Sequence, residues 1–177
     1  MAKITTKLGD HGVTQVAPDK VAPKSAAILG VMGDIDELSC VLGLCGDQFD
    51  QIQSFLSELM GYLYYKNNNE SRIAGQVMLM EEYINSHNNS IPTWFVNPKG
   101  FVSLARAVCR RAERSVVRAN NDQRDGGETS GYNFYPIMRY LNRLSDYLFV
   151  KSFEREADAP ELFPDELAVS EKIRAAL

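Results

Sequence analysis

The sequence has few of the residues that enzymes commonly use as nucleophiles, bases or metal ligands. Its 177 residues include only two histidines, His11 and His87, and three cysteines without the spacing of a metal site. A histidine-based triad and a multi-histidine metal centre are therefore disfavoured. No apolar run reaches the ~18 residues that a membrane span needs, and the first residues contain no apolar signal core. We expect a cytoplasmic protein without a membrane partner.

Positive charge is also scarce. The formal net charge is −4, which argues against a general nucleic-acid-binding protein. Apolar residues make up 45% of the chain and charged residues 24%, which is typical of a folded globular protein. The length suits one domain.

Apolar residues recur at helical spacing, and no segment sustains the alternation of a strand for more than a few residues. This pattern predicts five main helices, at about residues 26–45, 50–65, 73–85, 100–119 and 135–156. Gly30 and Gly33 weaken the start of the first helix, so we expect it to begin properly near Asp34. The result is an all-α fold, a five-helix bundle.

The two ends of the chain differ from this helical pattern. Residues 1–25 are polar and rich in glycine and proline, and we expect an extended or looped arm there. Residues 26–177 are expected to form a single helical-bundle domain. The polar stretch 120–131 is expected to be a loop, and residues 165–176 a short acidic helix.

The arm contains residue types that suit a phosphate. Glycines let the backbone approach a ligand closely, while hydroxyl groups, backbone amides and lysines can contact phosphate oxygens. These residues are Thr5, Thr6, Lys7, Gly9, Asp10, Gly12, Thr14 and Lys24. The spacing is not that of a P-loop. A polar arm with a glycine turn and no ligand explains the same residues.

The segment 106–118 is unusually rich in arginine. It holds five arginines and a single glutamate: Arg106, Arg110, Arg111, Arg114, Arg118 and Glu113. Arg106, Arg110 and Glu113 share one helical face, and arginine forms bidentate contacts with carboxylates and phosphates. A solvated charged face is the alternative, although the excess of arginine over acid favours an anion partner.

Two further polar clusters lie on predicted helices. Asn142 and Asp146 share a face with nearby arginines, and a structural network and a ligand contact explain them equally well. The run Asp34–Glu37 stands near a helix start, where acids are favourable. One of these acids can instead turn inward to pair with the arginine-rich helix.

Together these features describe an anion site without a good protein base or nucleophile. Such a site suits a reaction in which one substrate is the nucleophile and the protein stabilises an anionic leaving group. Transfer from a nucleoside triphosphate fits that description.

Four segments and one lysine resemble the PduO-type ATP:cob(I)alamin adenosyltransferases and occur in the order of that family. They are T-T-K-L-G-D-H-G-V-T (5–14), Lys24, G-D-I-D-E-L-S (33–39), R-A-V-C-R-R-A-E-R (106–114) and Y-L-N-R-L-S-D-Y-L-F (140–149). The resemblance covers about residues 5–150. It implies a ferritin-like five-helix bundle that assembles as a homotrimer with active sites between subunits.

The resemblance also implies a reaction. The family transfers the 5′-deoxyadenosyl group of MgATP to cob(I)alamin, and the products are adenosylcobalamin and triphosphate. The corrinoid cobalt is itself the nucleophile. A flavoprotein reductase and a corrinoid-dependent enzyme are the implied protein partners.

Roles for individual residues follow from the resemblance alone. It places Arg106, Arg110 and Asp36 at the catalytic centre, with Asp36 paired to Arg106. Glu113, with Mg²⁺, and Asn142 complete the nucleotide site, and the arm residues named above wrap the triphosphate. Arg111, Arg143 and Asp146 are expected to hold helices or subunits together.

The sequence departs from the family pattern in two places. Lys7 and Leu8 stand where the family has Arg and Thr, which replaces a bidentate phosphate contact by a point charge. The segment from Pro98 to Arg106 is about five residues shorter than usual, on the corrinoid side. Trp94, Phe95 and Phe101 are the candidates for covering the lower cobalt face.

These departures leave two alternatives to the enzyme. One is a catalytically altered relative that binds ATP or a corrinoid as a sensor or carrier. The other is a helical assembly module without a small-molecule site, in which acids neutralise Arg106 and Arg110.

Overall fold

A computed structural model describes residues 7–66, 69–87, 99–124, 129 and 131–154 of the chain. The predicted tail helix at 165–176 lies outside these residues. Thr5, Thr6, Trp94 and Phe95 lie outside them as well.

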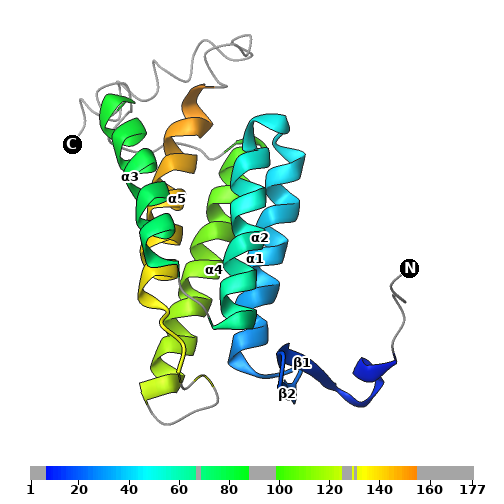
Figure 1. The fold of residues 1–177 in the computed structure, drawn as a ribbon. Coiled ribbons are helices and arrows are strands. Elements are labelled where there is room, and N and C mark those ends of the chain that lie inside the picture. Colours follow the sequence, from blue (N-terminus) through cyan, green and yellow to red (C-terminus); the bar gives the residue numbers. More distant parts are fainter. Residues whose placement is uncertain (1–6, 67–68, 88–98, 125–128, 130, 155–177) are drawn as a thin grey trace, which may run out of the picture.

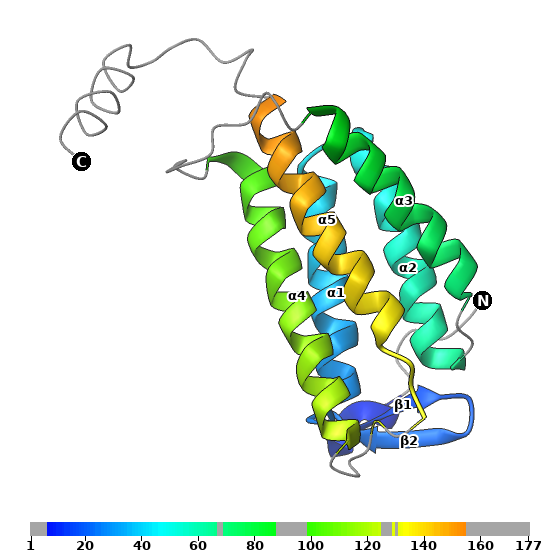
Figure 2. The same ribbon diagram turned by 90° about the vertical axis from the view of Figure 1, so that its left-hand side faces the viewer.

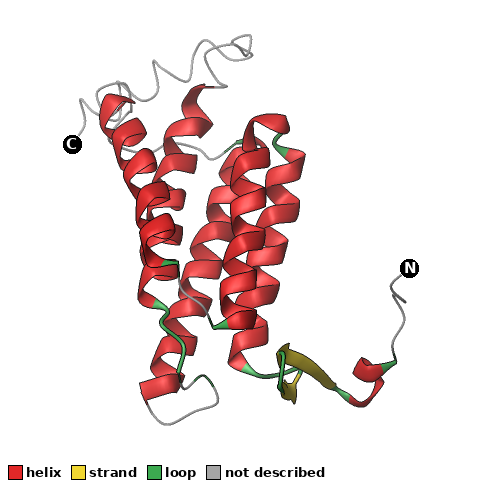
Figure 3. Cartoon of the chain, viewed as in Figure 1, coloured by secondary structure: helices red, strands yellow, loops and turns green. Residues whose placement is uncertain are grey.

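Five helices form an elongated bundle (Figures 1 and 3). They are α1 (Ala27–Leu44), α2 (Asp50–Tyr65), α3 (Glu70–His87), α4 (Gly100–Arg124) and α5 (Tyr135–Glu154), with a short 3-10 helix, η2 (Asp47–Phe49), before α2. Helix α1 packs against α2 and α4, α4 against α5, and α5 against α3. The predicted all-α five-helix fold is confirmed.

The helical spacing of apolar residues produces the core. Leu38 and Leu42 of α1 and Leu141 and Leu144 of α5 are fully buried. The ring of Tyr140 lies 4.9 Å from that of Phe55, measured between centroids, so α5 also contacts α2. Burial of such side chains contributes about 1.5–3 kcal/mol each to folding, which stabilises the packing of the bundle.

The expectation that the chain has no strands is wrong. In the arm, a short 3-10 helix, η1 (Leu8–His11), leads into an antiparallel hairpin of β1 (Val13–Ala17) and β2 (Lys20–Pro23). The strands are too short for an alternating pattern to stand out, and their register shifts between Gln15 and Ala17. The Gln15 side-chain amide donates a hydrogen bond to the Pro18 carbonyl (2.8 Å) and supports the turn.

Two predicted helix ends are also corrected. Helix α1 begins at Ala27 rather than near Asp34, because burial of Ile28 and Val31 offsets the helix-weakening effect of its glycines. Helix α4 continues to Arg124, beyond the expected end at Ala119. There the buried hydroxyl of Thr129 donates to the Ala119 carbonyl (2.7 Å) and lies 3.3 Å from Asp122 Oδ2, which ties down the last turns.

Membrane insertion finds no support in the described helices. None of them combines the length and the apolar composition that a span requires.

Candidate functional site

The predicted catalytic arginines lie in the first half of α4, along its boundary with α5. Because Arg106, Arg110 and Glu113 occupy successive turns of one helix face, the fold holds all three along this boundary. On α5, Asn142, Asp146 and Phe149 occupy the facing turns. The structure therefore places Asn142 and Asp146, which the sequence singled out, along the same boundary as the predicted α4 residues.

Arg106 is held by an aromatic ring instead of a carboxylate. Its guanidinium carbon lies 4.8 Å from the centroid of the Phe149 ring. Its Nε atom is buried and has no hydrogen-bond partner within the described chain. A buried donor without a partner is costly, so this arginine is suited to receive an acceptor that the described residues do not provide.

Arg110 lies one turn further along α4 and is exposed, as is Arg114. No carboxylate among residues 7–66, 69–87, 99–124, 129 and 131–154 lies within ion-pair distance of either side chain. The assembly-module alternative expects such acids. An unneutralised cationic face of this kind attracts anions.

Glu113 and Asn142 meet across the α4–α5 boundary. The side-chain amide of Asn142 donates to Glu113 Oε1 (3.1 Å), while its carbonyl oxygen accepts from Arg143 Nη1 (2.8 Å). The resemblance assigned Glu113 and Asn142 to one nucleotide site, and in the structure they are direct neighbours.

The acids of α1 pair with the arginine-rich helix, but through different residues than the resemblance implied. Arg111 forms ion pairs with Asp34 (3.5 Å) and Glu37, which link α1 to α4. Asp36 is exposed, and the described residues contain no ion pair between Asp36 and Arg106. Neighbouring helix residues point about 100° apart, so Asp36 faces away when Asp34 and Glu37 face α4.

In the arm, the backbone gathers several of the predicted phosphate-binding residues. Lys7 and Gly12 adopt left-handed backbone conformations at the two ends of η1, and the Lys24 amide donates to the Gly12 carbonyl (2.8 Å). The Lys24 side chain passes over Gly9, where an added Cβ would stand 2.9 Å from Nζ. The absence of a side chain at Gly9 therefore leaves room for the ammonium group.

The described residues of the arm and the arginines of α4 lie in different parts of a single copy. Figure 2 shows the hairpin at the end of the bundle where α1 begins and α4 ends, whereas Arg106 and Arg110 belong to the other half of α4. In Figure 1 residues 7–12, the described start of the arm, extend outward from the bundle, beyond β1. Within the described residues, this part of the arm is separate from the arginines of the same chain.

Beneath the arginine face lies a thiol. Cys109 is fully buried between α4 and α5, and its Sγ donates to the Leu141 carbonyl (3.2 Å). Burial raises the pKa of this thiol far above its ordinary value, and the charge of Glu113 acts in the same direction. Cys109 therefore stays protonated, so the side chain is not a nucleophile.

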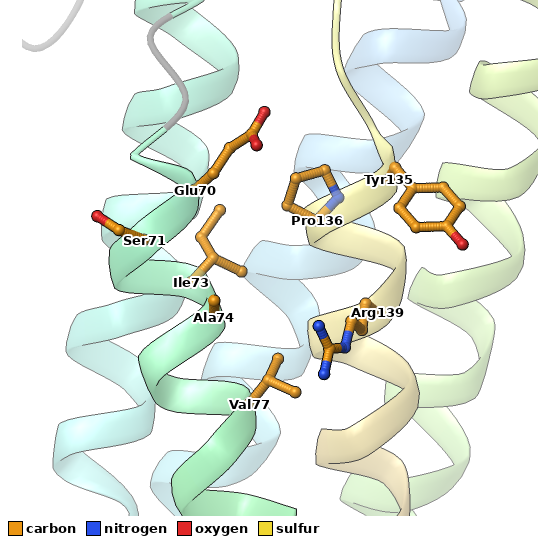
Figure 4. A pocket seen from close by; sticks show the side chains of 8 residues that line it. All are labelled: Glu70, Ser71, Ile73, Ala74, Val77, Tyr135, Pro136 and Arg139. Atoms are coloured by element: carbon orange, nitrogen blue, oxygen red, sulfur yellow. The ribbon is translucent and has the colours of Figure 1, made fainter.

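A hollow of about 350 Å³ lies elsewhere, between α3 and α5 (Figure 4). Ile73 and Val77 of α3 and Tyr135, Pro136 and Arg139 of α5 line most of it. It contains none of the predicted site residues. Within the described ranges, no three His, Cys, Asp or Glu side chains gather as a metal site.

Phe149 is the site residue that sequence reasoning missed. It falls inside the last quoted motif and stands seven residues after Asn142 and three after Asp146, on the same helix face. That spacing is the signal that places its ring beside the arginine face.

Three comparisons relate the chain to known proteins. Residues 4–154 match the family model for cobalamin adenosyltransferase. The chain is 31% identical over 167 residues to the cobalamin adenosyltransferase of Cupriavidus metallidurans, covering 85% of this chain and 86% of that protein. It is 30% identical over 173 residues to the human corrinoid adenosyltransferase MMAB, covering 83% of this chain.

The chain spans 66% of the length of the human relative. Among solved structures, a variant of the PduO-type ATP:corrinoid adenosyltransferase from Lactobacillus reuteri, complexed with cobalamin and ATP, shares the fold. Its TM-score is 0.62 at 24% identity, covering 85% of this chain and 91% of that one.

Proposed function

This chain belongs to the cobalamin adenosyltransferase family, and we propose that it transfers the 5′-deoxyadenosyl group of ATP to cob(I)alamin. One observation on the structure carries the proposal: Arg106 and Arg110 have no carboxylate partner in the described chain, and they lie two turns and one turn before Glu113, which accepts a hydrogen bond from Asn142. ATP and cobalamin are the molecules bound in the related Lactobacillus reuteri structure.

The reaction needs no nucleophile from the protein. The cobalt of cob(I)alamin, a substrate, gives its electron pair to C5′ of ATP, and a cobalt–carbon bond forms. The C5′–oxygen bond breaks, and its electron pair leaves with the triphosphate. The protein's task is to align the two substrates and to stabilise the negative charge that grows on the leaving oxygen.

In this proposal Arg110 contacts the triphosphate and stabilises the charge that develops there. Arg106 approaches the same region, with its plane fixed by the Phe149 ring. Glu113 and Asn142 orient the nucleotide. The described chain supplies no acid for Arg106, so Asp36 from a second copy is the partner that we propose for it.

The arm supplies the rest of the triphosphate site. We assign this role to Thr5, Thr6, Lys7, Gly9, Asp10, Gly12, Thr14 and Lys24, the residues of the 1–25 arm that precedes the helical domain at 26–177. Since residues 7–12 of the arm lie beyond the hairpin and away from their own bundle (Figure 1), they would reach the arginines of a neighbouring copy. A homotrimer with sites between subunits accounts for both halves of the site.

Magnesium fits this donor set. Mg²⁺ keeps several waters and takes phosphate oxygens together with one or two carboxylates, and Glu113 Oε2 accepts no hydrogen bond from any described residue. We therefore propose Glu113 as the protein carboxylate that would hold the ion. When bound, Mg²⁺ neutralises part of the triphosphate charge.

Two protein partners follow from the chemistry. Cob(I)alamin must be supplied by a reductase, for which a flavoprotein is the proposed class, and adenosylcobalamin must be taken up by a corrinoid-dependent enzyme. We propose the cytoplasm as the site of this exchange. Phe101, exposed at the start of α4, is the described candidate for the lower cobalt face.

The test is an anaerobic assay. The full chain is mixed with chemically reduced cob(I)alamin and MgATP, and the absorbance change to adenosylcobalamin is followed, with Arg110→Ala as control. We expect formation that depends on both protein and ATP. ATP binding without turnover would favour the sensor or carrier, and loss of both would leave the assembly module.

A further inference from the structure

The side-chain amide of Asn142 has a different partner at each end, one for its nitrogen and one for its oxygen. Its Nδ2 donates to Glu113 on α4, while its Oδ1 accepts from Arg143 (2.8 Å). A guanidinium has only donors. Arg143 therefore can meet only the oxygen of the amide, and this contact turns the nitrogen toward Glu113.

Arg143 is itself held by carboxylates on two helices. Its Nε donates to Glu81 Oε1 on α3 (2.9 Å), and its Nη1 lies 3.0 Å from Asp146 Oδ2. The planar fork of arginine lets one side chain contact Glu81, Asn142 and Asp146 together. Hydrogen bonds thus run without a gap from α3 to Glu113 on α4.

Stability alone does not explain this arrangement. The Arg143 and Glu81 side chains are 36% and 34% exposed, and ion pairs in such positions contribute little to folding. What the contacts do fix is an orientation. Glu113 keeps one oxygen bonded to Asn142, while the other accepts no hydrogen bond from the described residues.

We propose that Arg143, anchored by Glu81, is a positioning residue for the nucleotide site: it fixes the Asn142 amide and, through it, the Glu113 carboxylate. This inference rests on the proposed function, because ATP is the ligand for which the two side chains are held. We call Glu81, Arg143, Asn142 and Glu113 the Asn142 network.

The chain offers a matched control in Arg139. It stands one turn before Arg143 on α5 and also pairs with Glu81 (3.5 Å), but it makes no described contact with Asn142. Figure 4 shows its side chain on the α3–α5 side, beside Val77. Arg139→Gln removes an ion pair between the same two helices and leaves the amide contacts intact.

The experiment measures ATP affinity by calorimetry on the full chain. We expect Arg143→Gln to weaken ATP binding about 10-fold, as is typical when a partner that orients a ligating side chain is removed. Arg139→Gln should change affinity less than about 2-fold. In an Asn142→Ala background, Arg143→Gln should add less than about 2-fold, because its effect passes through the missing amide.

A second variant keeps the test sharp if Arg143→Gln folds poorly. Arg143→Lys retains the charge opposite Glu81, but a lysine ammonium lacks the fork that spans three acceptors. We expect its melting temperature to match that of Arg139→Gln, with ATP affinity reduced as in Arg143→Gln. If Asn142→Ala leaves no measurable binding, the comparison of Arg143→Lys with Arg139→Gln decides.

Two outcomes overturn the inference while the proposed function stands. In one, Arg143→Gln weakens ATP binding by the same factor in the wild-type and the Asn142→Ala backgrounds. In the other, Arg143→Lys has the same ATP affinity as Arg139→Gln. A wild-type chain that makes adenosylcobalamin with either result keeps its enzymatic assignment. A wild-type chain that does not bind ATP overturns both proposals.

Discussion

The arginines between helices and the arginines on the open face of α4 differ in their partners. Arg72, Arg111, Arg139 and Arg143 each meet a carboxylate of another helix: Glu58, Asp34 with Glu37, or Glu81. On the open face, Arg106, Arg110 and Arg114 have no such partner in the part of the chain that the structure describes.

Two arginines that are adjacent in the sequence belong to different classes, one with a carboxylate partner and one without. Arg110 and Arg111 are adjacent, yet the rotation of one residue along the helix turns Arg111 to α1 and leaves Arg110 exposed. The excess of arginine in this chain therefore has two roles. Part of it links helices, and the remainder is free to bind an anion.

Removing Arg110 should have the largest effect. We expect Arg110→Ala to lower kcat by about 10²- to 10³-fold, because a preorganised cation opposite the developing charge is lost. Its melting temperature should stay near wild type, since no described ion pair breaks. Arg114→Ala, one turn away and also exposed, is the control for charge alone, and equal losses in both variants would contradict the role of Arg110.

Asp36 is expected to affect the association of the chains. If Asp36 meets Arg106 of a second copy, Asp36→Asn should weaken association by about 2 kcal/mol, because it leaves that arginine unpaired. Sedimentation velocity over a dilution series measures this change. Glu37→Gln breaks only a pair within one chain and should leave association unaltered. If the two variants gave the same sedimentation profiles, Asp36 would not be an interface residue.

Arg111 should behave as the opposite of Arg110. Its ion pairs with Asp34 and Glu37 are partly exposed, so Arg111→Gln should lower the unfolding free energy only slightly. Thermal unfolding should show a fall in Tm of no more than about 4 °C, while calorimetry should show ATP binding close to wild type. If Arg111→Gln lost ATP binding while its Tm stayed unchanged, Arg111 would be a binding residue rather than a helix-linking one.

The smallest effect should be a pH dependence at the α3–α5 boundary. The hydrogen bond from Arg143 holds the pKa of Glu81 below its ordinary value of 4.5. Because the folded-state pKa is depressed, this contribution is present above about pH 4.5 and is lost as the pH falls through the lowered value. Urea unfolding at pH 7 and pH 3.5 measures how much unfolding free energy is lost on acidification. We expect this loss to be smaller in Glu81→Gln than in the wild type, and equal losses would contradict the pairing.

The helices and the family were predictable from the sequence, because apolar spacing and two long motifs are local signals. The family match confirms the predicted enzyme class, a corrinoid adenosyltransferase. The hairpin was not predictable, since strands of five and four residues leave little alternation to detect.

Within the candidate site, spacing indicated which residues share a face but not which neighbour each one meets. The separation of Arg110 from Arg111 depends on where α1 packs, and the ring of Phe149 reaches Arg106 only through the α4–α5 contact. Such choices are tertiary. The roles of the site residues remain predictions that the variants above address.

The burial of Cys109 has a chemical consequence for an enzyme of this kind. In the proposed site, adenosyl transfer would bring an electrophilic carbon and a highly reducing metal to the surface above this sulfur. A thiolate there would compete with cobalt for the alkyl group and would be lost to alkylation. With its proton retained and directed to the Leu141 carbonyl, the sulfur is a poor nucleophile, so the adenosyl group would have cobalt as its single acceptor in the proposed site.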